Sequence, residues 1–255
     1  MYGPAPPGFE RIVNERYCVF LGPMVQMTMV QRLRLSADEI EAAVSEVRLL
    51  ADERKRSRVT WWLGDSATPA DLEERLLAAG LERAAMPVHE PVYAALALVE
   101  PPSGTSETVA ARRVETIDEF ATAGEITHEA FGMTEEQREG FRNARPLLWE
   151  LERQDVSATY LAFVDGRPVA AATAVFADSA VMLVGGATLP EARGHGCYRA
   201  LVQARWDDAV RRSTPALVVQ AGEMSRPILE RLGFRLVSQL RVLVDERPQP
   251  EPSAA

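Results

Sequence analysis

The residues best suited to chemistry lie between Gly185 and Leu201, where the chain reads GGATLPEARGHGCYRAL. Gly194 and Gly196 flank the start of a helix that we expect over 196–212. Unpaired N–H groups and the positive end of the dipole at a helix start attract anions, and glycines leave no Cβ to obstruct them. Arg193 adds a guanidinium that can bind phosphate oxygens through paired hydrogen bonds. The segment therefore predicts an anion site, most naturally for phosphate.

The strand expected before this loop, over 180–189, contains two adjacent glycines. Gly185 and Gly186 indicate a bulge or a place where another group approaches the backbone. We therefore expect the strand to bend away from its parallel neighbour and open a cleft. The loop matches neither a Walker loop nor a dinucleotide fingerprint, because 194–199 lacks both the Gly-Lys-Ser/Thr ending of the first and the third glycine of the second.

The elements that position the loop follow from periodicity and turn residues. Asp165-Gly166 is a strong hairpin signal between two strand-like runs. Antiparallel strands therefore precede a strand–helix–strand unit that contains the loop. The expected strands of this part are 109–114, 159–164, 169–176, 180–189, 216–221 and 235–244, and the expected helices are 117–131, 135–151, 196–212 and 225–232.

The beginning of the chain predicts a shorter series. Ser36-Ala-Asp-Glu39 has the Ser-x-x-Glu pattern of a capping box, and apolar residues recur with a 3.6-residue period over 40–51. A second helix ends at Gly80. The expected order is strands at 17–21 and 24–35, the capped helix, a strand at 59–63, a helix at 69–79 and a strand at 92–98.

A segment rich in Pro, Ser, Gly and Thr divides the two series. Residues 101–108 (PPSGTSET) have no apolar period and predict a linker. The linker separates a first domain, 1–100, from a second, 109–245, both within the usual size of domains. The polar, Pro-rich segment 246–255 predicts a mobile tail.

The loop and the order of elements together carry a family resemblance. Arg193-Gly-His-Gly-Cys-Tyr198, after a strand with a bulge, resembles the R-x-x-G-x-[GA] loop of the GCN5-related N-acetyltransferases (GNAT). The resemblance covers about 140 residues, from the strand at 109–114 to the strand after Leu232-Gly-Phe234. It implies an α/β fold with a mixed sheet, and direct transfer of an acetyl group from acetyl-CoA to an amine of a small molecule or a protein, without a metal.

The resemblance also implies roles for individual residues. Backbone groups after the bulge would meet the pantetheine arm, the helix start would hold the pyrophosphate, and the region of Ser225 would contact the CoA arm. The residues implied for the arm are Ala187, Thr188 and Leu189, and those implied for the pyrophosphate are Arg193, Gly194, His195, Gly196, Cys197 and Tyr198.

The chain departs from the family pattern at three places. Leu229 stands where the family often has a tyrosine that protonates the leaving thiolate. Tyr198 replaces the last small residue of the loop, and we expect a structural role for it. The bulged strand carries no glutamate, and among the nearest carboxylates, Glu223 and Glu129, we predict Glu223 as the general base, acting directly or through water.

A weak internal repeat links the two domains. ADERKRSRVTWW at 51–62 is similar in kind to DAVRRSTPALVV at 208–219, so the first domain resembles a degenerate half of a GNAT domain. Its helix start carries Asp38 and Glu39 and no glycine. These carboxylates repel phosphate, so we expect the first domain to bind no CoA and to have a structural or acceptor-shaping role.

Composition narrows the partners. The formal charge of -9 argues against nucleic acid and against an anionic membrane surface. Cys18 and Cys197 lie far apart and the chain has three histidines, so we expect no metal site and no disulfide framework. Without a signal-like start or an apolar run of about 20 residues, we expect a cytoplasmic protein, a monomer or a homodimer.

Two other functions stay open at this stage. The lack of a tyrosine at position 229 and of a base in the bulged strand fits a non-catalytic CoA-binding or protein-interaction module. The bulk of Tyr198 fits a structural tandem fold whose loop no longer binds nucleotide. Cys197 allows two interpretations as well, a reactive thiol at a helix start or a small apolar residue in the first turn.

Overall fold

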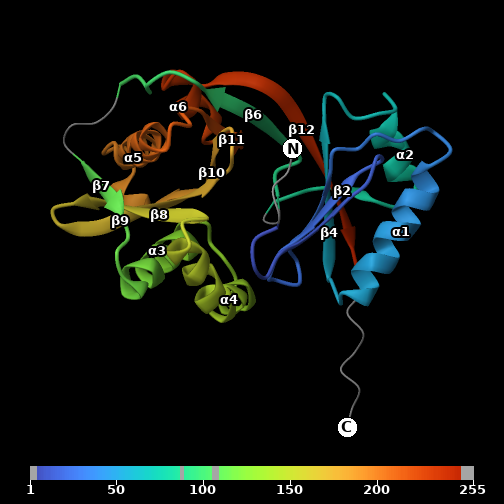
Figure 1. The fold of residues 1–255 in the computed structure, drawn as a ribbon, viewed down its shortest axis with the longest axis horizontal. Helices are drawn as coiled ribbons and strands as arrows, with labels where there is room; N and C mark the ends of the chain where they lie inside the picture. Colours follow the sequence, from blue (N-terminus) through green and yellow to red (C-terminus); the bar gives the residue numbers. More distant parts are fainter. Residues whose placement is uncertain (1–4, 87–88, 105–108, 248–255) are drawn as a thin grey trace, which may run out of the picture. The chain divides into compact units, whose positions relative to one another are not determined.

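The computed structural model describes residues 5–86, 89–104 and 109–247 (Figure 1). By its internal contacts the chain forms two compact units. Among the described residues, unit 1 comprises those within Ala94–Val237, and unit 2 combines those from Ala5 to Tyr93 with Ser238–Arg247. These limits differ from the predicted domains 1–100 and 109–245, which stay a prediction. The tail 248–255 and residues 105–108 of the linker lie outside the described residues.

Unit 1 is built on a mixed sheet. Its strands β10 and β11 are parallel, as expected for a strand–helix–strand unit, and the other neighbouring pairs are antiparallel. Asp165 and Gly166, both with positive φ, form the tight turn of the hairpin β8–β9. In order across the sheet, the strands are β6 (Val92–Leu98), β11 (Leu217–Ala221), β10 (Val181–Thr188), β9 (Arg167–Phe176), β8 (Ser157–Val164) and β7 (Ala110–Arg113).

Helices cover both faces of the unit 1 sheet (Figure 1). Helices α3 (Ile117–Ala130) and α4 (Glu135–Arg153) lie on one face, where Ile126 packs against Leu161 and Ala171. Helix α5 (Cys197–Arg211) lies on the other, with a larger core that includes Tyr160, Leu201 and Trp206. Helix α6 (Arg226–Arg231) adds Leu229 to that core. Alternate residues of β8 therefore serve two separate cores.

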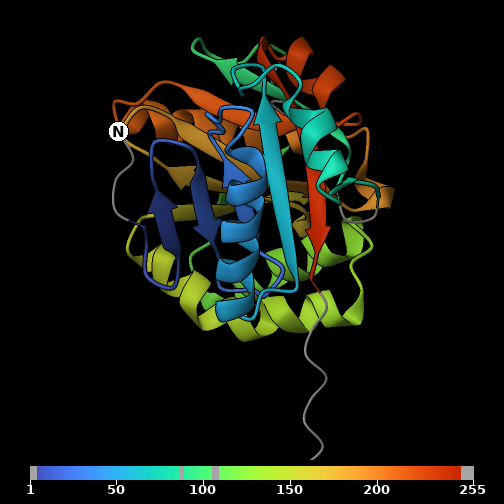
Figure 2. The same cartoon turned by 90° about the vertical axis from the view of Figure 1, so that its right-hand side faces the viewer.

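In unit 2, α1 (Ile40–Glu53) lies along one face of the strands (Figure 2). Trp61 is fully buried beneath α1 and α2 (Leu72–Ala78), whereas Trp62 packs on the opposite face. Strands β3 and β4 are parallel and joined through α1. The strands are β1 (Glu10–Val13), β2 (Cys18–Leu21), β3 (Thr28–Gln31), β4 (Arg58–Gly64) and β12 (Arg235–Glu246), with β5 (Glu82–Arg83) paired to β12.

Each unit is completed by a strand from the distant half of the chain. In unit 1, Ala94–Leu98 of β6 pairs with all five residues of β11, although β6 follows β4 and α2 in the sequence. In unit 2, Leu240–Glu246 of β12 pairs with β4, although β12 follows β11 and α6. The two similar series β3-α1-β4-α2 and β10-α5-β11-α6 have thus exchanged their final strands.

Three local expectations need correction. Ser36 is not the N-cap of α1: its N–H and hydroxyl both donate to the Glu39 carboxylate, and the helix begins after Glu39. The strand expected over 24–35 is limited to β3, because Met24 and Met27 form a hydrogen-bonded turn. Strands β1 and β5 were not expected. Both are short, and neither has the alternating apolar pattern that marks longer strands.

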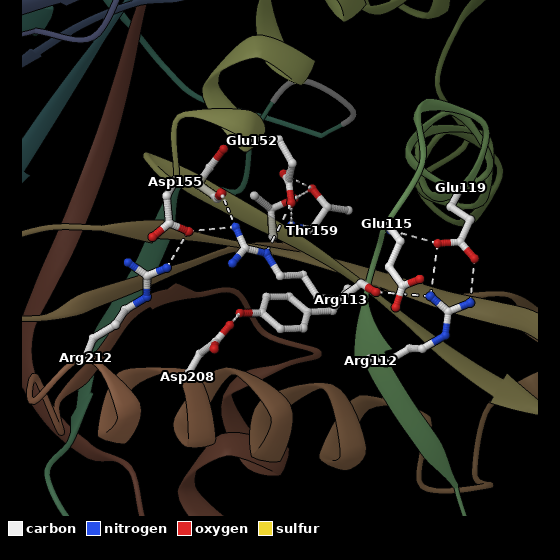
Figure 3. A network of polar contacts seen from close by, with 12 residues as sticks. Arg112, Arg113, Glu115, Glu119, Glu152, Asp155, Thr159, Asp208 and Arg212 are labelled. Atoms are coloured by element: carbon white, nitrogen blue, oxygen red, sulfur yellow. Dashed lines mark hydrogen bonds and ion pairs between the residues drawn. The ribbon is translucent and has the colours of Figure 1, made fainter.

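A polar network joins α4 to β7, β8 and the end of α5 (Figure 3). Arg113 donates to Asp155 at 2.8 Å, and Arg212 reaches the same carboxylate. The buried Glu152 accepts from the Thr159 N–H at 2.6 Å and from its hydroxyl at 3.1 Å. Burial raises the pKa of Glu152, and these hydrogen bonds oppose that rise. The network fixes the turn that leads into the sheet of unit 1.

Candidate functional site

The predicted bulge is present in β10. The register with β9 shifts between Val184 and Ala187, so Gly185 and Gly186 both stand opposite Ala172. Gly185 has φ of +60°, a conformation that L side chains rarely adopt. The bulge therefore depends on glycine, as the two adjacent glycines indicated.

The bulge coincides with the point where β10 leaves β11. The parallel pairing covers only Val181–Leu183 and stops before the bulge, whereas β11 continues to Ala221 against β6. Beyond Leu183, one edge of β10 therefore has no neighbouring strand among the described residues. Since the Leu189 N–H donates to Val169 at 3.0 Å, the alternation of a ladder turns the backbone groups of Thr188 toward this open edge.

Of the three residues implied for the pantetheine arm, only Thr188 turns its backbone groups to the open edge of β10. Ala187 pairs with Ala171 of β9, and the Leu189 N–H is used by β9, so neither turns its backbone to the open edge as Thr188 does. The Thr188 carbonyl accepts from Arg193 Nε at 3.4 Å, which holds the exposed guanidinium beside the same edge.

The loop after β10 reaches α5 through one 3-10 turn, Pro190–Ala192. Gly194 and Gly196 then adopt φ of +83° and +88°, and a Cβ at Gly194 would meet nothing within 4 Å. His195 between them is exposed. The glycines let the chain turn sharply into the helix while its N–H groups stay uncovered.

The start of α5 differs chemically from those of the other long helices. Thr116 caps α3 and Thr134 caps α4 through their side chains, and α1, α3 and α4 carry acidic residues in the first turn. Helix α5 has Gly196 as its N-cap, no side-chain cap and no acidic residue in its first turn. Its N-terminal donors are therefore left without a carboxylate or hydroxyl acceptor.

The side chains of the first two residues of α5 contact the loop and the bulged strand. Cys197 is buried and its thiol donates to the Ala192 carbonyl at a sulfur–oxygen distance of 3.9 Å. Burial raises the pKa of this thiol, so Cys197 fits the apolar interpretation and not that of a reactive thiol. Tyr198 is half-buried, and its ring lies against Gly186.

The remaining predicted residues lie near the end of β11. Glu223 is exposed in the turn that follows the strand, and the Ser225 hydroxyl donates to the Gly222 carbonyl at 3.3 Å instead of capping α6. Because β10 and β11 are parallel, this turn and the 189–196 loop both follow the carboxyl ends of their strands and leave the sheet on the same side. Leu229 has no exposed surface and belongs to the apolar core.

Histidine and acidic groups offer no metal site within the described residues, where no three His, Cys, Asp or Glu side chains converge. His128 is buried and lies 5.4 Å from the ring of Phe141, and burial lowers its pKa. In the part of the chain that the structure describes, no helix has the length and apolarity to cross a bilayer.

Sequence analysis did not single out Arg205 or the contact between Gly186 and Tyr198. Arg205 is buried in α5, with 1% of its surface exposed. A signal was available, because it falls on the apolar face defined by Leu201, Val202, Trp206 and Ala209, where an arginine is unusual.

Solved structures of other proteins share this fold. No family model and no curated protein matches the chain. A GCN5-related N-acetyltransferase from Kribbella flavida superposes with a TM-score of 0.68 and 19% identity, covering 94% of this chain and 90% of that one. A tandem GNAT protein from the clavulanic acid biosynthesis pathway gives 0.63 and 15% over 96% and 86%. A GCN5-related N-acetyltransferase from Sphaerobacter thermophilus gives 0.61 and 17% over 96% and 85%.

These matches define the fold class. The chain has the α/β fold of the GCN5-related N-acetyltransferases. The match to a tandem GNAT protein covers 96% of this chain, so the similarity in fold includes both β3-α1-β4-α2 and β10-α5-β11-α6. The predicted fold, a GNAT-like domain preceded by a smaller degenerate one, is confirmed at this level.

Proposed function

We propose that the protein is an N-acyltransferase that moves an acetyl group from acetyl-CoA to an amine of a small molecule or a protein. The observation that carries this proposal is the open edge of β10, which runs from the bulge to the uncapped start of α5. An extended polar chain that ends in phosphate fits both features, because the edge supplies ladder groups and the helix start supplies anion-binding donors.

The proposed binding mode assigns each end of the CoA molecule. The pyrophosphate meets the N–H groups from Gly194 to Tyr198, with Arg193 as the charged partner. The pantetheine arm follows the edge past Thr188, whose backbone groups point outward. Ser225 contributes at the turn after β11, which leaves the sheet beside the loop.

Transfer requires a neutral amine, and we propose Glu223 as its base. The carboxylate takes the amine proton directly or through water, since it is exposed on the turn that follows β11. The amine nitrogen then attacks the thioester carbonyl, the C–N bond forms, and the C–S bond breaks. Positioning of both substrates and hydrogen bonds from the bulged strand to the oxyanion supply the rate enhancement.

The test is a thermal melt with added acetyl-CoA. Ligand at 100 times its dissociation constant stabilises a folded protein by about 2.7 kcal/mol, and we expect a clear rise in Tm. Gly194→Asp places a carboxylate at the helix start and should abolish the rise. Gly166→Asp is the matched control, because both glycines have positive φ and open space around a Cβ. No rise with the unmodified protein at millimolar acetyl-CoA would contradict the proposal.

A second candidate is a CoA-binding module without catalysis. The burial of Leu229 in the apolar core favours it, because no hydroxyl is available at the position where the family often has a proton donor. Release of CoA thiol in the presence of a panel of amines separates the candidates. Transfer to any amine eliminates the non-catalytic module, whereas binding without transfer to any member supports it.

We also propose that the first domain binds no CoA and serves a structural or acceptor-shaping role. The helix start in question carries Asp38 and Glu39, and hydrogen bonds from Ser36 lower the pKa of both carboxyls. Both are therefore ionised at neutral pH and repel phosphate. One mole of CoA bound per mole of chain in calorimetry is the expected stoichiometry.

A further inference from the structure

The Tyr198 side chain occupies a definite place beside the bulge. A Cβ built on Gly186 would lie 2.7 Å from Tyr198 Cε2 and 3.5 Å from both Cδ2 and Cζ, so the side of the ring next to the hydroxyl-bearing carbon packs on this glycine. Gly186 is also where β10 has parted from β11. The phenol therefore stands at the inner end of the open edge, away from the exposed loop.

The Tyr198 hydroxyl has no assigned task in the fold. Among the described residues none accepts its proton in a hydrogen bond, and the oxygen is not sealed from solvent as the Arg205 Nη2 is. The other tyrosine of this core behaves differently. Tyr160 is buried on β8, and its hydroxyl donates to the Asp208 carboxylate of α5 (Asp208 is labelled in Figure 3).

Arg205 lies seven residues after Tyr198, on the same face of α5. Its Nε donates to the Leu201 carbonyl at 2.9 Å and its Nη1 to the Thr173 carbonyl at 3.3 Å. The Nη2 is buried without a hydrogen-bond partner, and the hydrogen bonds of this guanidinium within the described residues go to backbone carbonyls and not to a carboxylate. A buried cation without a counter-ion is costly, and it favours a neighbour that can become negative.

The bond to Thr173 places Arg205 directly at the bulge. Thr173 of β9 pairs with Val184, the last residue of β10 before the register shifts. Burial raises the pKa of the Tyr198 phenol, and the charge of Arg205 opposes that rise. The phenol is therefore neutral at pH 7, and the phenolate, once formed, has a cation nearby.

We propose that the Tyr198 hydroxyl gives its proton to the CoA sulfur when the thioester is cleaved, with Arg205 as the positioning residue that offsets the charge left on the phenol. The inference rests on the proposed function. Gly186 precedes Thr188 by two strand residues, a distance of about 7 Å along β10. An arm that starts at the α5 loop and follows the open edge past Thr188 therefore leads its sulfur end to the bulge. Tyr198 on α5 thereby supplies the hydroxyl that position 229 lacks.

The proton balance closes. The base takes one proton from the ammonium, and the neutral amine then forms the C–N bond. The C–S bond breaks, and the sulfur takes the phenol proton to leave as CoA thiol. The second proton that the nitrogen loses on becoming an amide passes through water to the phenolate beside Arg205. No oxidant or metal takes part.

The experiment measures the thiol pKa of bound CoA from thiolate absorbance, with the acetyl-CoA complex as the blank for protein groups. A phenol that donates to the sulfur stabilises the thiolate, so we expect a pKa below the ordinary thiol value of about 8.5. Tyr198→Phe keeps the ring and should raise the pKa by about one unit, a tenfold change in ionisation. The other titratable or charged groups on α5, on the strands packed against it and on the adjoining loops include Tyr160, Asp208, Cys197, Arg193, His195, Glu223, Arg199, Asp207, Arg211, Arg112, Arg113 and Arg167.

Tyr160→Phe is the control, because it removes a hydroxyl from the same core that is already bound to Asp208. It should leave the thiol pKa unchanged. Arg205→Met should raise the pKa as Tyr198→Phe does, and if it does not fold, Tyr198→Phe decides alone. Equal thiol pKa values in the unmodified protein and Tyr198→Phe overturn this inference while the proposed function stands. No binding of CoA overturns both.

Discussion

Arg193 is the residue on which the affinity for phosphate should depend most. Its guanidinium is exposed and held beside the Thr188 carbonyl, where it faces the edge that the arm is proposed to follow. We expect Arg193→Ala to weaken the binding of CoA about tenfold to a hundredfold, because a hydrogen bond to a charged group contributes about 1.5–3 kcal/mol. Calorimetric titration at fixed ionic strength measures the change.

Arg167→Ala is the matched control, since Arg167 is an exposed arginine at the start of β9. It removes the same charge from the same sheet, at the hairpin end. An equal loss of affinity in both variants would show that net charge, and not the loop, governs binding.

Sequence analysis at this scale found the residues of the loop but not their partners. The R-G-x-G pattern predicts a turn into a helix because glycine conformation is a local property. The partner of the Tyr198 ring is Gly186, twelve residues away and in another element, and chain spacing does not encode such a contact. Ser36 shows the same limit. Its pattern fits an N-cap, whose hydroxyl accepts from a backbone N–H, but the Ser36 hydroxyl donates to the Glu39 carboxylate.

The bulged strand β10 offers a prediction at the scale of elements. Gly186→Ala adds a methyl group that meets the Tyr198 ring at 2.7 Å, so we expect it to destabilise unit 1 by about 1–3 kcal/mol. In a Tyr198→Ala background most of that cost should vanish, because the ring is gone. Urea unfolding of the four proteins in the cycle measures the coupling.

Gly185→Ala is the comparison for this cycle. Its Cβ meets nothing within 4 Å, and the cost of about 1–2 kcal/mol arises from the positive φ alone. That cost should be the same with tyrosine or alanine at position 198. Additive effects for Gly186→Ala would mean that the ring moves away without loss.

Elements with strong local signals were predicted closely. The hairpin β8–β9 follows from Asp165-Gly166, and the expected strand 92–98 matches β6. The pairing of these strands was beyond the reach of periodicity. Nothing local in β6 indicates that it pairs with β11, more than 100 residues later, because alternation specifies a face and not a neighbour.

At the scale of the molecule, the exchanged strands decide which fragments fold. We expect a fragment of residues 94–237 to unfold in one cooperative transition, because it contains the described residues of unit 1 and the part of β6, Ala94–Leu98, that pairs with β11. A fragment of the predicted second domain, 109–245, lacks β6 and exposes the edge of β11. It should be aggregation-prone and lack a cooperative transition.

Circular dichroism melts and light scattering of the two fragments test this. Trp149 and Trp206 lie in both fragments, so their fluorescence reports on the same two cores in each, one on either face of the sheet. Equal, cooperative melting of the two fragments would mean that the β6–β11 pairing contributes little to unit 1.

The exchange of strands also imposes an order on synthesis. Strand β4 is complete once Gly64 has been made, but the strand that pairs with it ends at Glu246. At a translation rate of about 5–20 residues per second, the edge of β4 stays without its final neighbour for roughly 10–40 seconds. During that time the neighbouring Trp62 cluster lacks Val242 and Val244, which later pack against it. Folding of unit 2 during synthesis is therefore expected to finish only after Glu246 has been made.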